Sequence, residues 1–137
     1  MPRGDPEFLN VDLDLECRQP LGRLADALPL TVMFSTGMRG KYVMSLEAAW
    51  PTPPLDGTLR RLAKMISSLC RDARRLWQRA SKRCFNIGFA CGSRRAPPFL
   101  IQSSTVAAIA ALGGSIEVTL YPSDESRRPR PKRAKSG

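Results

Sequence analysis

Three acidic residues, Asp12, Asp14 and Glu16, recur at every second position near the N-terminus. In an extended strand this spacing places all three side chains on one face, where their oxygens could bind a divalent cation. The same alternation is typical of a strand whose outer face is solvated or paired with a basic helix. We favour this second interpretation, because the residues between the acids are apolar and alternation alone accounts for the pattern.

The residue types that support most enzymatic chemistry are missing. The chain has no histidine, which is the commonest general base and metal ligand. A nucleophilic Ser or Cys normally needs a neighbouring base, and no G-x-x-x-x-G-K-[ST] or G-x-G-x-x-G phosphate-binding sequence occurs. The sequence therefore predicts a protein that is not an enzyme and that holds no cofactor or metal.

The cysteines are Cys17, Cys70, Cys84 and Cys91, and none forms a C-x-x-C pair. Without histidine, a zinc site would need four cysteines, which usually come in closely spaced pairs. We expect free, buried and reduced thiols, as in a cytoplasmic protein. The N-terminus carries no apolar signal segment, and no apolar run is long enough to span a membrane. These observations favour a cytoplasmic location.

Positive charge is concentrated in the centre of the chain. The 137 residues carry 22 bases and 12 acids, and eleven of the bases lie within residues 58–95 beside a single acid. Apolar residues recur there every three or four positions, which predicts an amphipathic helix over residues 58–83, or two helices broken near Ser67 and Ser68. Its basic face could form ion pairs with an acidic protein surface and steer association. The candidate partner-binding residues are Arg71, Arg74, Arg75, Arg79, Lys82, Arg94 and Arg95.

A second basic segment ends the chain. Residues 122–137 are rich in proline and charge, which predicts a disordered tail after a single domain over residues 1–121. Because each base can neutralise a phosphate, the alternative hypothesis is a nucleic-acid-binding accessory protein that uses the helix and the tail. A solvated helix face and a solubilising tail, neither with a partner, remain a third interpretation. The tail residues in question are Arg127, Arg128, Arg130, Lys132, Arg133 and Lys135.

The predicted elements follow the order β-α-β-β-α-β-α-β. The first six match the split β-α-β order of ferredoxin-like folds, so we expect an α+β fold with a mostly antiparallel sheet and helices on one face. Asp56 is expected to cap the central helix, Ser103 or Ser104 the last one, and Ser35 to Gly37 with Gly40 to form a turn. Strands are expected at residues 8–17, 30–34, 42–50, 85–91 and 116–121, and helices at residues 20–28, 58–83 and before Gly113.

Residues 76–88 have the form L-W-x-x-A-x-x-R-x-F-x-I-G, and the final strand has the form I-x-V-T-x-Y. Over residues 60–121 the chain resembles small uncharacterised bacterial single-domain proteins. By analogy, such proteins are similar in size and style to immunity proteins, which block a cognate toxin. The motif also has a packing explanation, with Trp77 and Phe85 in the core and Arg83 bonding carbonyls at the end of the helix.

These observations favour a non-enzymatic protein-binding module, specifically an immunity-type inhibitor that binds through a basic helical face. Its partner would be an acidic-surfaced toxin or effector. Inhibitors of nucleases tend to be acidic because they mimic the charge of the substrate, so the net charge of +10 disfavours a nuclease target. Trp77 lies on the apolar side of the helix, which also argues against a role in stacking on bases.

Overall fold

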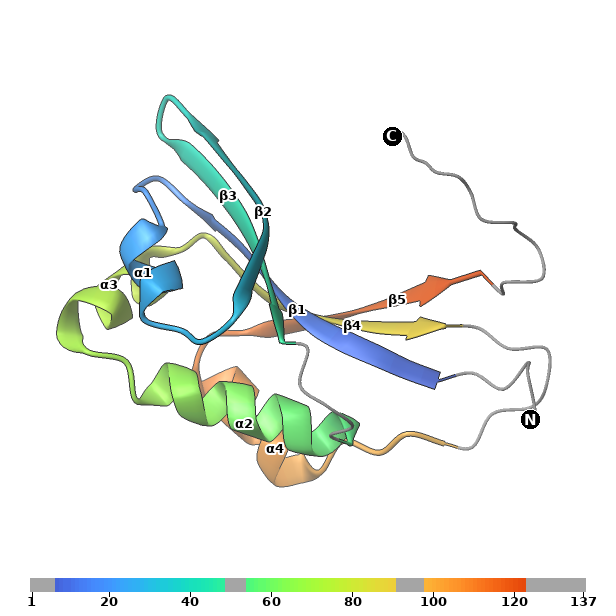
Figure 1. Ribbon diagram of the computed structural model, residues 1–137. Helices are drawn as coiled ribbons and strands as arrows, with labels where there is room; N and C mark the ends of the chain where they lie inside the picture. The colour runs from blue at the N-terminus through green and yellow to red at the C-terminus, as the bar shows by residue number, and fades with distance from the viewer. Residues whose placement is uncertain (1–6, 49–53, 91–97, 123–137) are drawn as a thin grey trace.

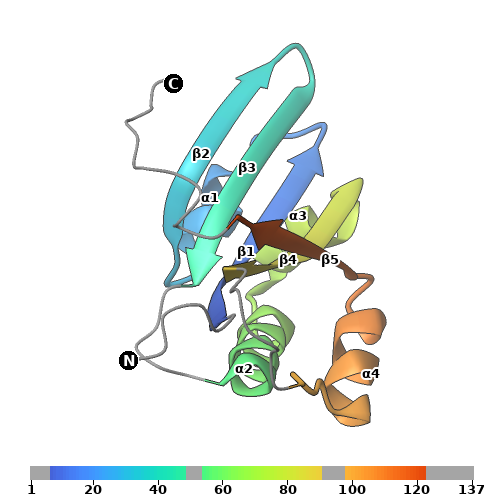
Figure 2. The ribbon, with the colours of Figure 1, turned by 90° about the vertical axis from the view of Figure 1, so that its right-hand side faces the viewer.

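The computed structural model describes residues 7–48, 54–90 and 98–122 (Figure 1). These residues form one five-stranded sheet with all four of their helices on the same face (Figures 1 and 2). The predicted α+β class and element order are confirmed. The elements are β1 (Glu7–Cys17), α1 (Gly22–Asp26), β2 (Thr31–Met38), β3 (Lys41–Ala48), α2 (Leu55–Ser67), α3 (Arg71–Arg79), β4 (Lys82–Ala90), α4 (Ser103–Ala111) and β5 (Ser115–Tyr121).

The strand order in the sheet is β2-β3-β1-β4-β5. The first four strands pair antiparallel in the arrangement of a split β-α-β fold, as the sequence predicted. β5 then adds to β4 in parallel, and α4 makes the crossover between them. β2 and β5 are consequently the two edge strands of the sheet.

Alternation in β1 fixes which face of the sheet is covered. Val11, Leu13 and Leu15 are fully buried, and the residues beside them on β3 and β4, such as Leu46 and Phe85, are buried as well. The helices supply the other half of this core through the apolar sides of α1, α2 and α3. The opposite face of the sheet is left to the polar residues of the same strands.

The central helix is broken, which decides between the two predicted possibilities. α2 ends at Ser67 and α3 begins at Arg71. The side chain of Arg74 bridges the break, because its Nη2 donates to the carbonyl oxygens of Ser67 (2.9 Å) and Leu69 (3.1 Å). A cation at this position satisfies carbonyls that have no partner within the helix and complements the negative end of its dipole.

The predicted turn at Ser35 to Gly37 is wrong, because β2 continues to Met38. The hairpin instead turns at Arg39 and Gly40, both with positive φ, as expected for a two-residue connection between twisted strands. The predicted helix caps are also wrong. α2 already begins at Leu55, and Gln102 rather than a serine precedes α4.

The packing explanation of the 76–88 motif is confirmed. Trp77 is buried, lies edge-on to Phe85 with ring centroids 6.4 Å apart, and donates from Nε1 to the carbonyl oxygen of Leu112 (2.9 Å). Arg83 donates to the carbonyl oxygens of Trp77, Gln78 and Gly113. These contacts join the end of α3 to the end of α4, so the motif belongs to the interior.

Candidate functional site

Four of the predicted partner-binding residues lie together on α3, on the helical side of the molecule. Arg71, Arg74, Arg75 and Arg79 are exposed on α3, and Lys82 is exposed at the start of β4. Arg94 and Arg95 lie outside the described residues, as do the bases of residues 127–135. The structure therefore places four of the seven predicted residues on one surface, whereas Lys82 lies beside Glu16 of β1 on the opposite face of the sheet.

The four arginines of α3 are not equivalent. Arg74 is committed to the backbone at the end of α2, so its role is structural. Arg79 makes one long contact of 3.4 Å to the side-chain oxygen of Gln19. Arg71 and Arg75 form no ion pair with any described residue, and they line a hollow of about 400 Å³ beside Leu69. Free cationic charge on α3 is thus supplied mainly by these two arginines.

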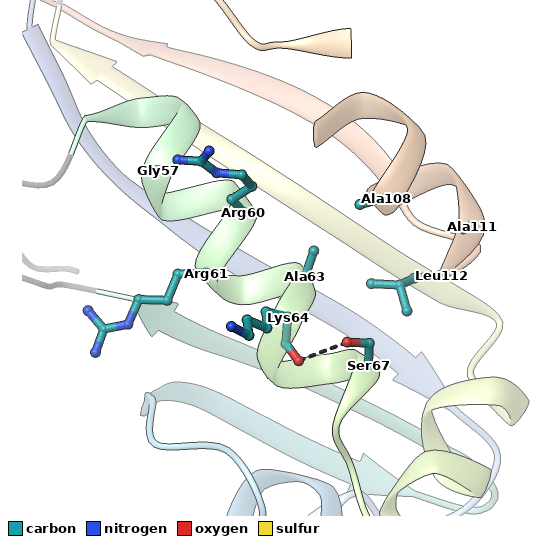
Figure 3. Close-up of a pocket in the computed structure, with 9 residues that line it drawn as sticks. All are labelled: Gly57, Arg60, Arg61, Ala63, Lys64, Ser67, Ala108, Ala111 and Leu112. Atoms are coloured by element: carbon teal, nitrogen blue, oxygen red, sulfur yellow. Dashed lines mark hydrogen bonds between the residues drawn. The ribbon is translucent and has the colours of Figure 1, made fainter. Parts of the chain in front are cut away.

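A larger groove runs between α2 and α4, with a volume of about 720 Å³ (Figure 3). In Figure 3, Ala63 of α2 and Leu112 at the end of α4 point into the gap between the helices, while Arg61 and Lys64 extend from the side of α2 away from α4. The groove therefore has an apolar interior and a basic margin. Its lining residues are Gly57, Arg60, Arg61, Ala63, Lys64, Ser67, Ala108, Ala111 and Leu112.

Asp56 joins the first turn of α2 to the start of α4. Its Oδ1 accepts a hydrogen bond of 2.8 Å from the backbone amide of Gln102, directly before α4. This bond lowers the pKa of Asp56 below its ordinary value of 3.8, and nearby Arg60 lowers it further. Oδ2 of Asp56 also lies 3.8 Å from Nε of Arg60, which ties this margin residue to the first turn of α2.

The sequence interpretation missed the α4 side of this groove. α4 has the sequence SSTVAAIAA and carries no charged residue. Only Thr105 and Ile109 are buried, whereas Val106 remains 44% exposed. A helix that is apolar on all sides is normally covered on all sides. The absence of charged residues from residues 103–111 was the available signal that this helix presents an apolar surface.

The acidic residues of β1 lie on the opposite side of the molecule. Their face of the sheet points away from the helices, so the predicted pairing of Asp12, Asp14 and Glu16 with the basic helix is wrong. Asp14 instead accepts hydrogen bonds from Ser45 (2.8 Å) and Asn86 (3.2 Å) on the neighbouring strands. The two faces of the molecule therefore differ in charge, one basic and helical, the other acidic and strand-built.

Asp12, on this acidic face, has a carboxylate oxygen, Oδ1, that is buried without a hydrogen-bond partner among the described residues. Burial, with the nearby charges of Glu47 and Asp14, raises the pKa of Asp12 to about 6. The described residues contain no group of three or more Cys, Asp or Glu side chains that could hold a metal ion.

The cysteines that the structure describes are all free. Cys17 and Cys84 are buried, as expected, but Cys70 is exposed at the start of α3, so the prediction of burial is wrong for that thiol. Burial raises the pKa of Cys84 above its ordinary value of 9.0. Cys91 lies outside the described residues. Among the described helices, none is long and apolar enough to cross a membrane.

Comparison with known proteins gives no match. Neither a protein family, nor a curated protein, nor a solved structure is significantly similar to the chain.

Proposed function

We propose that the protein is a non-enzymatic module that binds an acidic protein through its basic helical side, with the α2–α4 groove at the centre of the interface. The observation that carries this proposal is the combination within the groove of an apolar interior, formed by Ala63, Ala108 and Leu112, with basic residues at its margin. An interface that is apolar at its centre and polar at its rim is the usual arrangement in protein complexes.

The helical side supplies charge complementarity. Lys64 lines the groove, whereas Arg71 and Arg75 of α3 line a separate hollow on the same side of the molecule. All three are exposed, and none forms an ion pair with a described residue. Such charges accelerate association with an acidic surface and fix its orientation more than they add affinity. The apolar interior would supply the burial that holds the complex together.

An immunity-type role is the finer form of this proposal. In this role the chain would use its groove and its positive charge to cover an acidic surface of a toxin, without catalysing a reaction. The analogy with small bacterial immunity proteins supports this form, and the basic charge favours a target other than a nuclease.

Nucleic-acid binding is the second candidate, favoured by the unpaired arginines of α3 and the bases of residues 127–135. Two observations argue against nucleic-acid binding. A phosphate backbone makes no use of an apolar groove. Trp77, the aromatic residue of the basic helical segment 58–83, is buried and bonded to Leu112. Base stacking on this surface therefore has no platform among the described residues.

Affinity capture from a lysate of the source organism, with and without nuclease, tests the two candidates. We expect a discrete protein that survives nuclease treatment and is lost with Lys64→Glu. Lys41 is an exposed lysine at the start of β3, away from the groove. The Lys41→Glu variant carries the same charge change and should still bind the partner. Binding that vanishes with nuclease and falls steeply with salt would replace the protein-partner proposal with the nucleic-acid one.

A further inference from the structure

Among the residues that the structure describes, nothing pairs with the outer edge of β5. β5 bonds to β4 on one side, and no described strand lies on its other side. Its sequence, SIEVTLY, contains no proline and no base, and its single charge is Glu117. Natural sheets usually protect such an edge with lysine, proline, a bulge or a covering element, because exposed backbone groups recruit further strands.

The edge also exposes an apolar row. Ile116, Val118 and Leu120 lie beside Phe85, Ile87 and Phe89 of β4 and share their side of the sheet, the side that carries the helices. Phe85 and Ile87 are fully buried, but Val118 is 53% and Leu120 is 63% exposed. Helix α4 lies on the same side of the molecule (Figure 2).

The other edge strand, β2, also lacks proline and carries no charge, but it is less regular. β2 has a register irregularity between Val32 and Phe34, which interrupts regular pairing and increases twist. It leads directly into the tight turn at Arg39 and Gly40, where both residues have positive φ. The two edges therefore differ in backbone regularity although both expose apolar side chains, and β5 is the edge suited to pairing.

We infer that β5 pairs with β5 of a second copy of this chain, antiparallel and about a two-fold axis through Val118. Strand addition at an open edge is a common recognition mode, and an isologous contact needs a self-complementary surface. The sequence of β5 meets this requirement. Ile116 lies opposite Leu120 of the second copy, Val118 opposite its counterpart, and Glu117 opposite Thr119 of the second copy.

Charge in this register favours the second copy as occupant. Because Glu117 faces a threonine, the two acidic side chains are not paired directly, and like charges opposite one another would be unfavourable. The two-fold axis is perpendicular to the sheet, so both sets of helices lie on one face of a continuous sheet. The two α4 helices then flank the joined apolar row, and Val106, 44% exposed in the single chain, lies on the element that approaches it.

The predicted dimer is weak. One pair of seven-residue strands covers less than the roughly 800 Å² per partner of a standard interface. We therefore expect a dissociation constant in the micromolar range, and sedimentation velocity from about 1 µM to 1 mM should show a concentration-dependent monomer–dimer equilibrium.

Two valines on opposite edges provide a matched test. Val118→Lys should leave a folded monomer across this concentration range, whereas Val32→Lys, at 46% exposure on β2, should dimerise as the unaltered chain does. Circular dichroism and thermal unfolding verify that both variants fold. A chain that stays monomeric throughout, or a dimer that persists in Val118→Lys, would overturn the proposal.

A disulfide test locates the axis. Directly opposed residues of an antiparallel pair have Cα atoms about 4.5 to 5.5 Å apart, within the range of a disulfide. In a background with Cys70→Ser and Cys91→Ser, Val118→Cys should form a cross-linked dimer under mild oxidation, and Val32→Cys should not. Equal cross-linking of the two variants would exclude the β5 axis.

Discussion

The carboxylate of Asp56 on α2 accepts a 2.8 Å hydrogen bond from the backbone amide of Gln102, the residue that leads into α4. Two segments 46 residues apart are joined at this point, where the groove begins. The amide concerned belongs to the unpaired group of donors at a helix start, so the side chain of one helix caps another helix. This hydrogen bond therefore positions the start of α4, while the bond from Trp77 to Leu112 positions its end.

Replacing Asp56 should loosen α4. The lowered pKa of Asp56 means that its stabilising contribution is present above the ordinary pKa of 3.8 and is lost as the pH falls through the folded-state value. We expect Asp56→Ala to reduce the thermal midpoint at pH 6 and to differ progressively less from the unaltered chain as the pH is lowered below 3.8. Thermal unfolding monitored by circular dichroism at both pH values measures this. A difference that does not change with pH would contradict the role of the carboxylate.

Arg83 should matter more than the other arginines near it. It donates to the carbonyl oxygens of Trp77, Gln78 and Gly113, whereas Arg79 makes only one long contact with a side chain. Arg83→Met should lower the free energy of unfolding by about 2 kcal/mol, because it leaves these carbonyls without a charged donor. Arg79→Met should cost less than about 0.5 kcal/mol. Urea denaturation compares the two, and equal costs would be inconsistent with the structure.

Asp12 should make the protein less stable as the pH rises. Because folding raises its pKa from 3.8 to about 6, the carboxyl favours the folded state below pH ~4 and loses that contribution as the pH rises through 6. Asp12→Asn should stabilise the protein at pH 7.5 by about 1 kcal/mol, less than the full shift implies because water screens a half-buried group. The two chains should converge near pH 4. Parallel pH profiles in urea denaturation would contradict this assignment.

Filling the groove should block binding without unfolding the chain. Ala108 lines the groove, whereas Ala110, also on α4, is exposed and does not. Ala108→Trp should abolish capture of the nuclease-resistant partner, and Ala110→Trp should preserve it. Thermal midpoints of both variants serve as the folding control. If both tryptophans are tolerated, the partner does not enter the groove.

Much of the fold could be predicted because its signals are local. The apolar alternation of β1 and β4, and the helical spacing around Trp77, each identify an element and its buried side. The break after Ser67 could only be suspected, because it depends on Arg74 reaching back to carbonyls of α2. The caps were predicted wrongly for a similar reason, since Asp56 serves α4 rather than its own helix.

The candidate site was only half predictable. Its basic residues lie within one continuous segment and were visible as charge. The apolar wall at Ala108 and Leu112 lies more than 40 residues beyond Lys64 in the sequence, and only the crossover from β4 to β5 brings it alongside α2. Composition likewise gave no sign that the acids of β1 face away from the helices, because that depends on which face of the sheet the helices cover.

Site-specific photo-cross-linking tests the central claim most directly. A photoreactive amino acid at position 108 lies in the groove, and one at Thr36 lies on the opposite face of the sheet, where the side chain is exposed. In nuclease-treated lysate of the source organism, we predict one discrete cross-linked protein from position 108, lost with Lys64→Glu, and none from position 36. Cross-links that are identical at both positions, or that disappear with nuclease treatment, would contradict a protein-binding groove between α2 and α4.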